Sequence, residues 1–230
     1  MFSYQLSRSA RRKSLAITVK EGQVFVRAPA RLPQSQIDQF INQKAHWIAQ
    51  KLKQSVLNAV IANQAFDQGS SILIGGNTYE IAYQAEEHQA VHIKEGICYV
   101  PIDTSATPEV KRETCRQQLL DYYLKAAKAD IPARLAFWIE RTQLHPSGFK
   151  TRFYKSRWGS CNSKGQLTFN TLLTMMPERV IDYVIVHELC HLVHMNHSAD
   201  FWSLVERFMP EYQSCKQWIN QHQQPLNVFR

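Results

Sequence analysis

The chain lacks several features that would place it in a specialised class of protein. It has no run of about 18 uncharged apolar residues, which argues against a membrane-spanning helix. Its first residues lack the apolar segment of a secretory signal. The five cysteines are scattered and include no C-x-x-C pair, which argues against a disulfide framework or a cysteine zinc site. We therefore expect a cytoplasmic protein that does not associate with membranes.

Acidic residues are scarce at the start of the chain. Residues 1–60 contain ten Lys or Arg and two acids, and this excess accounts for the whole net charge of +8. A basic surface of this kind can attract nucleic acid or an acidic partner. Because no DNA- or RNA-binding motif accompanies it, a solvated basic face without a partner is the alternative. Nucleic-acid association through residues 1–60 is therefore an expectation from charge alone.

The first half of the chain shows the patterns of short strands. Alternating apolar residues predict a hairpin over 15–26, with its turn at Glu21-Gly22, and further hairpins over 72–81 and 91–100. Between the first two hairpins, the spacing of apolar residues predicts an amphipathic helix over 35–57.

The second half of the chain is mainly helical in pattern. Helices are predicted over 109–129 and 132–143, and Pro132 is expected to separate them. The fold class that follows is α+β. We expect two regions: 1–105, which is strand-rich with one amphipathic helix, and 106–230, which carries a mainly helical catalytic region with a short sheet beside its central helix.

One segment, HELCHLVHMNH at residues 187–197, concentrates the chemistry of the chain. It holds four of the nine histidines and one carboxylate. On a helix, His187 and His191 lie on one face, about 6 Å apart along the axis. Two imidazoles at that separation can share one tetrahedral Zn²⁺, and Glu188 beside them can take a proton from water. The pattern therefore predicts a metal-dependent hydrolase.

Such a motif also occurs by chance in helices that bind no metal, so its context matters. The preceding residues 180–186 are strongly apolar, as expected of a buried helix that carries a metal site. Pro177-Glu178 provides a plausible first turn for that helix. Cys190 is interpreted as a small core residue rather than a ligand. This context favours metal binding.

The third ligand requires a choice between two histidines. On a straight helix, His194 would lie about 10.5 Å along the axis from His187. His197 can return to the metal if the helix ends near Met195-Asn196, after which Ser198 could cap a following helix. We therefore predict His197 as the third ligand, which leaves a fourth position open for water.

The segment before the metal helix is predicted to border the cleft. Residues 151–161 and 166–170 have the pattern of two strands around a Gly-containing turn. In a peptidase, such a strand can pair with an extended substrate. Arg157 and Asn170 are candidates for substrate binding. The alternative is that Arg157 and Trp158 pack only to build the sheet.

Taken together, these motifs resemble the bacterial YgjP-like metal-dependent hydrolase family, which is related to the SprT-like and WLM zinc metallopeptidases. The segments that carry the resemblance are RWGSC at 157–161, LTFN at 167–170, IDYVIVHELCH at 181–191 and NHS at 196–198, with further likeness near Arg11-Arg12 and KAHWI at 44–48. The resemblance implies a zincin-like core with zinc on His187, His191 and His197 and with Glu188 as general base. SprT-like and WLM relatives act on proteins attached to DNA, which suits the basic start of the chain by analogy.

Several alternatives remain open. The histidine spacing equals that of metzincins, but His194 stands where their turn glycine lies. A gluzincin-like site would use Glu206 or Glu211 as third ligand. A bacterial rRNA-maturation family of endoribonucleases shares the H-x3-H-x5-H spacing, although glycine follows its first histidine where this chain has Glu188. A zinc-stabilised module that binds DNA or protein without catalysis is the last alternative.

The prediction from sequence is thus a zinc metallopeptidase that hydrolyses protein or peptide substrates. The expected cofactor is Zn²⁺, and another divalent metal is an alternative because histidine sites accept several.

Overall fold

A computed structural model describes residues 3–20, 22–85, 90–222 and 228–229. The chain divides into two compact units, Met1–Gln64 and Ala65–Arg230. Both strands and helices are present, which confirms the predicted mixture of α and β structure with a strand-rich N-terminal part. In the described part of the chain, none of the helices combines the length and apolar character needed to cross a membrane.

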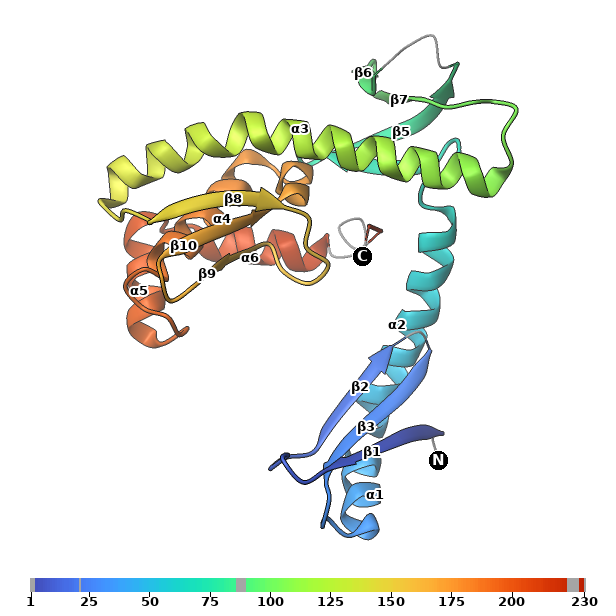
Figure 1. The fold of residues 1–230 in the computed structure, drawn as a ribbon, viewed down its shortest axis with the longest axis vertical. Helices are drawn as coiled ribbons and strands as arrows, with labels where there is room; N and C mark the ends of the chain where they lie inside the picture. The colour runs from blue at the N-terminus through green and yellow to red at the C-terminus, as the bar shows by residue number, and fades with distance from the viewer. Residues whose placement is uncertain (1–2, 21, 86–89, 223–227, 230) are drawn as a thin grey trace. The chain divides into compact units, whose positions relative to one another are not determined.

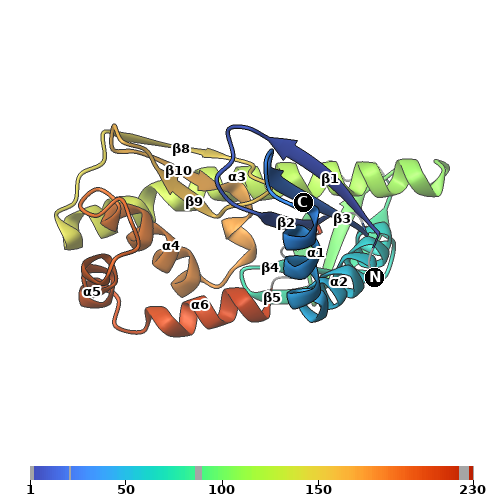
Figure 2. The same ribbon diagram turned by 90° about the horizontal axis from the view of Figure 1, so that it is seen from below.

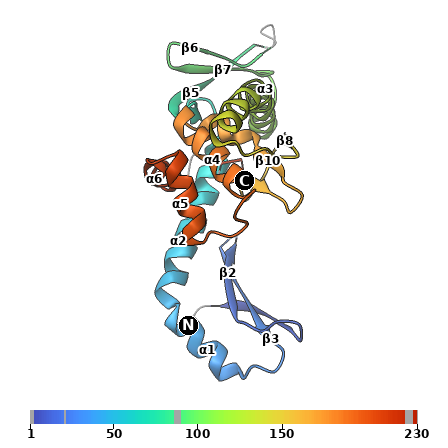
Figure 3. The ribbon, with the colours of Figure 1, turned by 90° about the vertical axis from the view of Figure 1, so that its left-hand side faces the viewer.

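The first unit is a three-stranded sheet covered by two helices. Its elements are β1 (Tyr4–Ser9), β2 (Ala16–Lys20), β3 (Gln23–Pro29), α1 (Gln34–Gln43) and α2 (Ala45–Gln64). The strand order is β1-β3-β2, in which β1 is parallel and β2 antiparallel to β3. Figure 3 shows α1 and α2 on one side of β2 and β3.

Alternation along β3 explains this arrangement. Val24, Val26 and Ala28 point to one face, where they join Ile37 and other buried aliphatic side chains of the helices in a small separate core. The hairpin predicted over 15–26 is confirmed. Its turn contains Gly22 at φ +73°, a conformation that suits glycine, whereas Glu21 lies outside the described residues.

The helix predicted over 35–57 differs from the structure. Two helices occupy this segment, and the chain turns between them at Lys44, whose N–H bonds to the carbonyls of Phe40 and Ile41. The strand β1 was not predicted. It is mostly exposed, so it carries no alternation of apolar residues that could signal a strand.

The second unit begins with a four-stranded sheet of two hairpins. The strands are β4 (Ser71–Ile74), β5 (Asn77–Gln84), β6 (His92–Lys94) and β7 (Ile97–Pro101), in the order β4-β5-β7-β6. Both predicted hairpins are confirmed.

The turn between β4 and β5 also fixes the approach to a later helix. Gly75 and Gly76 both have positive φ, as a two-residue hairpin turn of this hand requires. Their N–H groups donate to the carbonyls of Thr174 and Met175 at 2.9 and 2.8 Å. A Cβ at position 76 would collide with the ring of Pro177, so glycine allows the turn to pack directly against this proline.

A single long helix, α3 (Pro108–Thr142), follows this sheet and is labelled in Figure 1. The predicted break at Pro132 is wrong, because the helix continues through this residue. Proline there removes one backbone hydrogen bond, at a cost of about 3 kcal/mol in a helix interior. Ile131 and Leu135 are buried on either side of it, and their packing holds the helix together across the proline.

A second small sheet and a short 3₁₀ helix come next. The strands are β8 (Gly148–Arg152), β9 (Gly159–Cys161) and β10 (Gln166–Asn170). Their order is β8-β10-β9, with β10 parallel to β8 and antiparallel to β9, so β9 is an edge strand. The 3₁₀ helix η1 (Thr171–Met175) starts directly after β10.

Three helices complete the unit: α4 (Glu178–Cys190), α5 (Ala199–Phe208) and α6 (Tyr212–Gln221). Figure 2 shows α4 between the β8-β10-β9 sheet and α6. Of its thirteen residues, nine are buried, because α4 packs against α3, α5, α6 and the sheet.

The boundary between the two compact units lies between Gln64 and Ala65, so the β4–β7 sheet belongs to the second unit. The reason is that the β4–β7 sheet shares one hydrophobic core with the helices that follow it. Ile72 and Ile81 of the sheet pack in the same cluster as Leu119 and Tyr123 of α3. In addition, the Tyr123 hydroxyl donates to the carbonyl of Leu73 at 2.7 Å.

Candidate metal centre

Helix α4 begins and ends in ways that its sequence partly predicts. It starts at Glu178 directly after Pro177, as expected. It ends at Cys190, which is about one and a half turns earlier than the predicted end near Met195-Asn196. After Cys190 the chain forms tighter turns, in which the N–H groups of Leu192 and Val193 donate to the carbonyls of Leu189 and Cys190, three residues earlier. Apolar residues continue past the end of α4, at Leu192 and Val193, so the sequence pattern predicted a longer helix than the one observed.

The early end of α4 brings three histidines together. His187, His191 and His197 each offer one ring nitrogen, and these nitrogens all lie within 4.8 Å of one another. The Nε2 atoms of His187 and His197 are 3.1 Å apart. Nitrogen ligands on one tetrahedral Zn²⁺ lie about 3.3 Å apart, because each Zn–N bond measures about 2.0–2.1 Å. The observed spacing therefore fits a shared metal ion.

The segment after α4 holds His197 in place. Residues 192–197 return across the end of α4, and Ser198 then caps α5 by accepting a hydrogen bond from the N–H of Phe201 at 3.3 Å. The predicted cap is confirmed. The ring of Phe201 is fully buried and stacks on His191, with ring centres 4.5 Å apart. The start of α5 thus supports the histidine cluster from one side.

His194 contributes its backbone instead of its ring. The Nδ1–H of His191 donates to the carbonyl oxygen of His194 at 2.9 Å. This bond places the proton of a neutral His191 on Nδ1 and leaves the lone pair on Nε2 available. Metal-binding histidines usually make such a bond to a carbonyl or a carboxylate.

The charge state of the cluster also suits a metal. Burial, together with the neighbouring His191, His197 and Lys216, lowers the pKa of His187 to about 3. Burial and the charges of His191 and Lys216 lower the pKa of His197 as well. Both rings are therefore unprotonated near neutral pH, with lone pairs free to coordinate. Three imidazoles form a donor set that divalent transition metals accept.

Glu188 lies beside the cluster in an environment that disfavours its charge. Its side chain is 5% exposed, and burial raises its pKa to about 8, although the positive charge of Arg157 works in the opposite direction. Among the described residues, its buried Oε2 atom has no hydrogen-bond partner. A buried carboxyl with this pKa can accept and release a proton near neutral pH.

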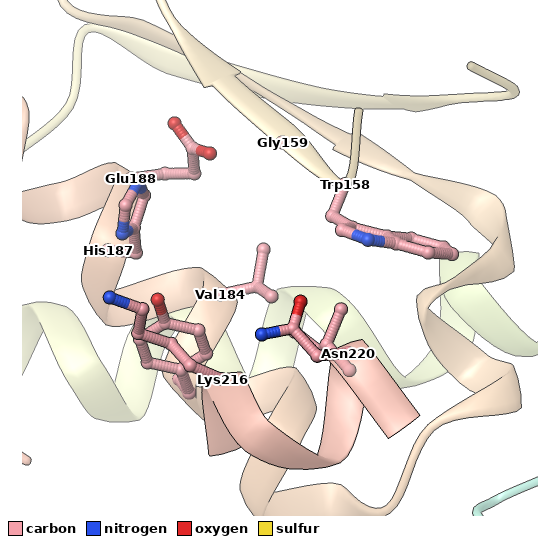
Figure 4. Close-up of a pocket in the computed structure, with 9 residues that line it drawn as sticks. Trp158, Gly159, Val184, His187, Glu188, Lys216 and Asn220 are labelled. Atoms are coloured by element: carbon pink, nitrogen blue, oxygen red, sulfur yellow. The ribbon is translucent and has the colours of Figure 1, made fainter. Parts of the chain in front are cut away.

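A glycine makes room for this carboxyl. A Cβ at Gly159 would lie 2.5 Å from Oε1 and 2.6 Å from Cγ of Glu188. Glycine therefore allows the backbone of the edge strand β9 to pack directly against the acid, and Figure 4 shows Glu188 extending from α4 toward this strand. No role was predicted for Gly159, although the glycine of the RWGSC segment is a sequence signal for such a close approach.

A pocket of about 300 Å³ opens next to these groups. Its lining includes His187 and Glu188 from α4, Trp158 and Gly159 from the sheet side, and Lys216 from α6 (Figure 4). Lys216 was not predicted from the sequence. No motif surrounds it, and only the fold brings α6 to the metal cluster.

The two predicted substrate-binding residues differ in position. Arg157 is exposed, its guanidinium lies over the Tyr154 ring at 5.6 Å, and its charge reaches Glu188. Asn170 is fully buried, and its side-chain amide donates to the carbonyls of Tyr154 and Arg157 at 2.9 and 2.8 Å. Its oxygen accepts from the N–H of Leu172 at 3.1 Å. The contacts of Asn170 therefore hold the loop that carries Arg157 and are all internal.

The glutamates considered as alternative third ligands lie elsewhere. Within the described residues, the group of side chains close enough to share a metal consists of the three histidines and includes neither Glu206 nor Glu211. The gluzincin-like alternative is therefore contradicted by the geometry.

Comparison with known families identifies the chain. The model of the YgjP-like family, described as a metallopeptidase domain, matches residues 13–222. This protein belongs to the YgjP-like family. The resemblance noted in the sequence is therefore confirmed, and the match covers both units of the chain. Membership identifies the chain as a metal-dependent peptidase of this family, and the three-histidine cluster offers a site for the divalent metal that such a domain requires.

Other comparisons add less about the YgjP-like chain. No curated protein matches it significantly. Among solved structures, the crystal structure of the metallopeptidase zymogen of Pyrococcus abyssi abylysin is similar to 40% of this chain and 95% of its own length, with 20% sequence identity and a TM-score of 0.37.

Proposed function

We propose that this YgjP-like protein is a zinc-dependent peptidase, with His187, His191 and His197 as metal ligands and Glu188 as general base. The observation that carries the proposal is the convergence of three imidazoles beside one buried carboxyl. Three protein ligands leave a fourth tetrahedral position for water or substrate, which is the arrangement of catalytic rather than structural zinc. We further propose that the arrangement of α4 and the β8-β10-β9 sheet is zincin-like.

The chemistry divides between the metal and Glu188. A bound Zn²⁺ supplies Lewis-acid activation of water and of the scissile carbonyl. Glu188 accepts a proton from the attacking water and passes it to the leaving amine. Both transfers need the carboxyl to change protonation state readily near neutral pH, and its burial against Gly159 supports this requirement.

Strand β9 offers a docking edge for an extended substrate. It is the edge strand of its sheet, and its first residue, Gly159, packs on Glu188. A peptide that adds to this edge through backbone hydrogen bonds would be placed next to the acid and the metal. Arg157, which precedes β9 and is exposed, is proposed to contact the same peptide. The exposed edge favours a peptide over a compact small molecule as substrate.

All of these groups lie within residues 106–230, which we propose as the catalytic region. Nucleic-acid association through residues 1–60 remains a prediction from charge. Residence in the cytoplasm remains a prediction from the scattered cysteines and from the missing features of membrane and secreted proteins. The alternative readings as an endoribonuclease or a non-catalytic binding module lack a specific observation in their favour, whereas the buried Glu188 beside the histidines favours hydrolysis of amides.

The test combines metal analysis with activity. Elemental mass spectrometry of the purified protein should find about one zinc ion per chain, as a single tetrahedral site requires. It should hydrolyse unfolded casein, and a chelator should abolish this activity until Zn²⁺ is restored. The Glu188→Gln variant should retain the metal and lose turnover.

A labelled RNA assayed under the same conditions separates the main alternative. Cleavage of RNA that depends on Glu188, without cleavage of casein or of a peptide library, would overturn the proposal. Full peptidase activity of Glu188→Gln would remove Glu188 from the mechanism.

A further inference from the structure

The pocket beside the metal centre combines apolar walls with one cation. Val184 and Ile219 line it together with the indole of Trp158. Lys216 and Asn220, one turn apart on α6, supply its polar groups (Figure 4). A volume of about 300 Å³ has room for one long side chain of a bound peptide. The walls suit an aliphatic stem, and the polar groups suit a polar end.

Aromatic rings hold Lys216 in place, and it forms no ion pair with any residue that the structure describes. Its Nζ lies 3.9 Å from the centre of the Trp202 ring. Trp202 stacks in turn on Tyr212 and His197, with ring centres 5.4 and 5.7 Å apart. Among the described residues, no carboxylate lies within the 4.0 Å of an ion pair from this ammonium. Cation–π contact holds the charge in position without neutralising it.

The electrostatics of the pocket call for an anion. Of the described residues that line the pocket, Glu188 alone carries a carboxyl group, and it is buried against Gly159. A divalent metal on the three imidazoles would add positive charge next to Lys216. Two cations at one pocket repel each other unless an anion lies close to both. The partner missing from this arrangement is therefore a negatively charged group on the substrate.

We propose that this pocket binds a carboxylate of the peptide substrate, paired with Lys216, and so selects peptides with an acidic group next to the scissile bond. The inference rests on the proposed peptidase function and names its substrate class. The carboxylate can come from an acidic side chain or from the free C-terminus of a peptide. Asn220 lines the same space (Figure 4).

The test compares matched peptides and charge variants. Fluorogenic peptides would differ only next to the scissile bond, with Glu, Gln or Lys there, and each would be made with a free and an amidated C-terminus. Wild-type protein should prefer the acidic peptides by about 10- to 100-fold in kcat/KM, which is the usual size of one charge-assisted hydrogen bond. If the preference depends on Glu, the side-chain carboxylate is the group that binds Lys216. If it depends on the free C-terminus, the terminal carboxylate is that group.

Substitutions of Lys216 then test whether this residue causes the preference for acidic peptides. Lys216→Met keeps the aliphatic stem over Trp202 and should remove the preference mainly through KM. Lys216→Arg should retain it, and Lys216→Glu should shift it toward the peptide with Lys. The exposed Lys128 on α3 provides the matched control, since Lys128→Met should leave the preference unchanged. An equal fall in kcat for all peptides in Lys216→Met would overturn the proposal, because it would assign Lys216 to the reacting carbonyl.

A binding measurement separates failure of this inference from failure of the proposed function. Calorimetry of zinc-loaded Glu188→Gln protein needs no turnover, and it would use N-acetyl-glutamyl and N-acetyl-glutaminyl dipeptides, each with a free and an amidated C-terminus. Binding that is tighter by about 10-fold or more when the side-chain or terminal carboxylate is present, and that is lost in the double variant with Lys216→Met, supports the pocket even if no peptide is cleaved. Equal binding of all four dipeptides would overturn the inference even in an active peptidase.

Discussion

The two walls of the cleft contribute different things. Helix α4 and the turn after it supply the nitrogen donors and the acid, all within residues 187–197. The second wall has two parts, β9 and α6, which lie on either side of α4 (Figure 2) and supply a close backbone approach at Gly159 and a cation at Lys216. In the proposed function, the first wall holds the reacting groups and the second shapes the space for the substrate. It follows that activity and selectivity should respond separately to substitutions.

The strongest test of this division acts on the first wall. His187→Ala removes one of three metal donors, so bound metal should fall to the level of chelator-treated protein and kcat/KM should fall by about 10⁴-fold or more. Metal mass spectrometry and casein hydrolysis measure the two effects. His194→Ala is the matched variant and should keep its metal, because only the backbone carbonyl of His194 is used. Equal metal loss in both variants would contradict the assigned ligands.

Glu188→Gln should lower kcat by about 10²- to 10⁴-fold while metal content stays the same. It should also change the stability of the metal-free protein. The carboxyl of Glu188 has a pKa of about 8 in the folded protein against an ordinary value of 4.5. It therefore stays protonated to a higher pH in the folded state than in the unfolded state. The stabilisation this provides is complete below pH 4.5 and is lost as pH rises through about 8.

Glutamine carries no such charge, so the variant should gain stability relative to wild type as pH rises. Urea unfolding of metal-free protein at acidic, neutral and alkaline pH measures the free energy of unfolding. Parallel curves for the two proteins across this range would show that the acid is not desolvated in the folded state.

Gly159→Ala tests the second wall. The added methyl would collide with Glu188, so the free energy of unfolding should fall by about 1–3 kcal/mol and kcat should fall with unchanged metal content. Ser160→Ala on the next residue is the control, since a Cβ is already present there. Wild-type activity in Gly159→Ala would show that β9 does not position the acid.

The smallest expected effect concerns the cap of α5. Ser198→Ala removes the acceptor for the Phe201 N–H and should cost about 1 kcal/mol in the free energy of unfolding. Because this cap follows His197, zinc affinity should weaken several-fold in a competition titration. Ser203→Ala, at an exposed position within α5, should leave both quantities nearly unchanged. The same zinc affinity in both variants would show that the Ser198 cap does not position His197.

Local sequence signals predicted the first wall better than the second. The histidine spacing, Pro177 before α4 and Ser198 before α5 each act within a few residues, so a single segment reveals them. Gly159 and Lys216 gain their meaning only from residues distant in the chain. Their proximity to Glu188 and His187 depends on how β9 and α6 pack on α4, which no local pattern encodes.

The errors in the fold have the same origin. Packing of Ile131 and Leu135 carries α3 through Pro132, against the local preference of proline. At Lys44 the opposite occurs, because the chain turns between α1 and α2 where neither glycine nor proline marks a break. At Pro132 tertiary packing outweighs propensity, whereas at Lys44 no local signal marks the turn. The hairpin predicted over 72–81 turns at Gly75-Gly76, where glycine suits the positive φ of both residues.

The short length of β9 limits self-association of the protein through its sheet edge. An unpaired sheet edge invites other chains to add to it, and long flat edges promote aggregation. With three residues, β9 presents only a few free backbone groups. A ligand anchored elsewhere in the cleft can use them, whereas an unrelated strand gains too little from so short a ladder to remain attached.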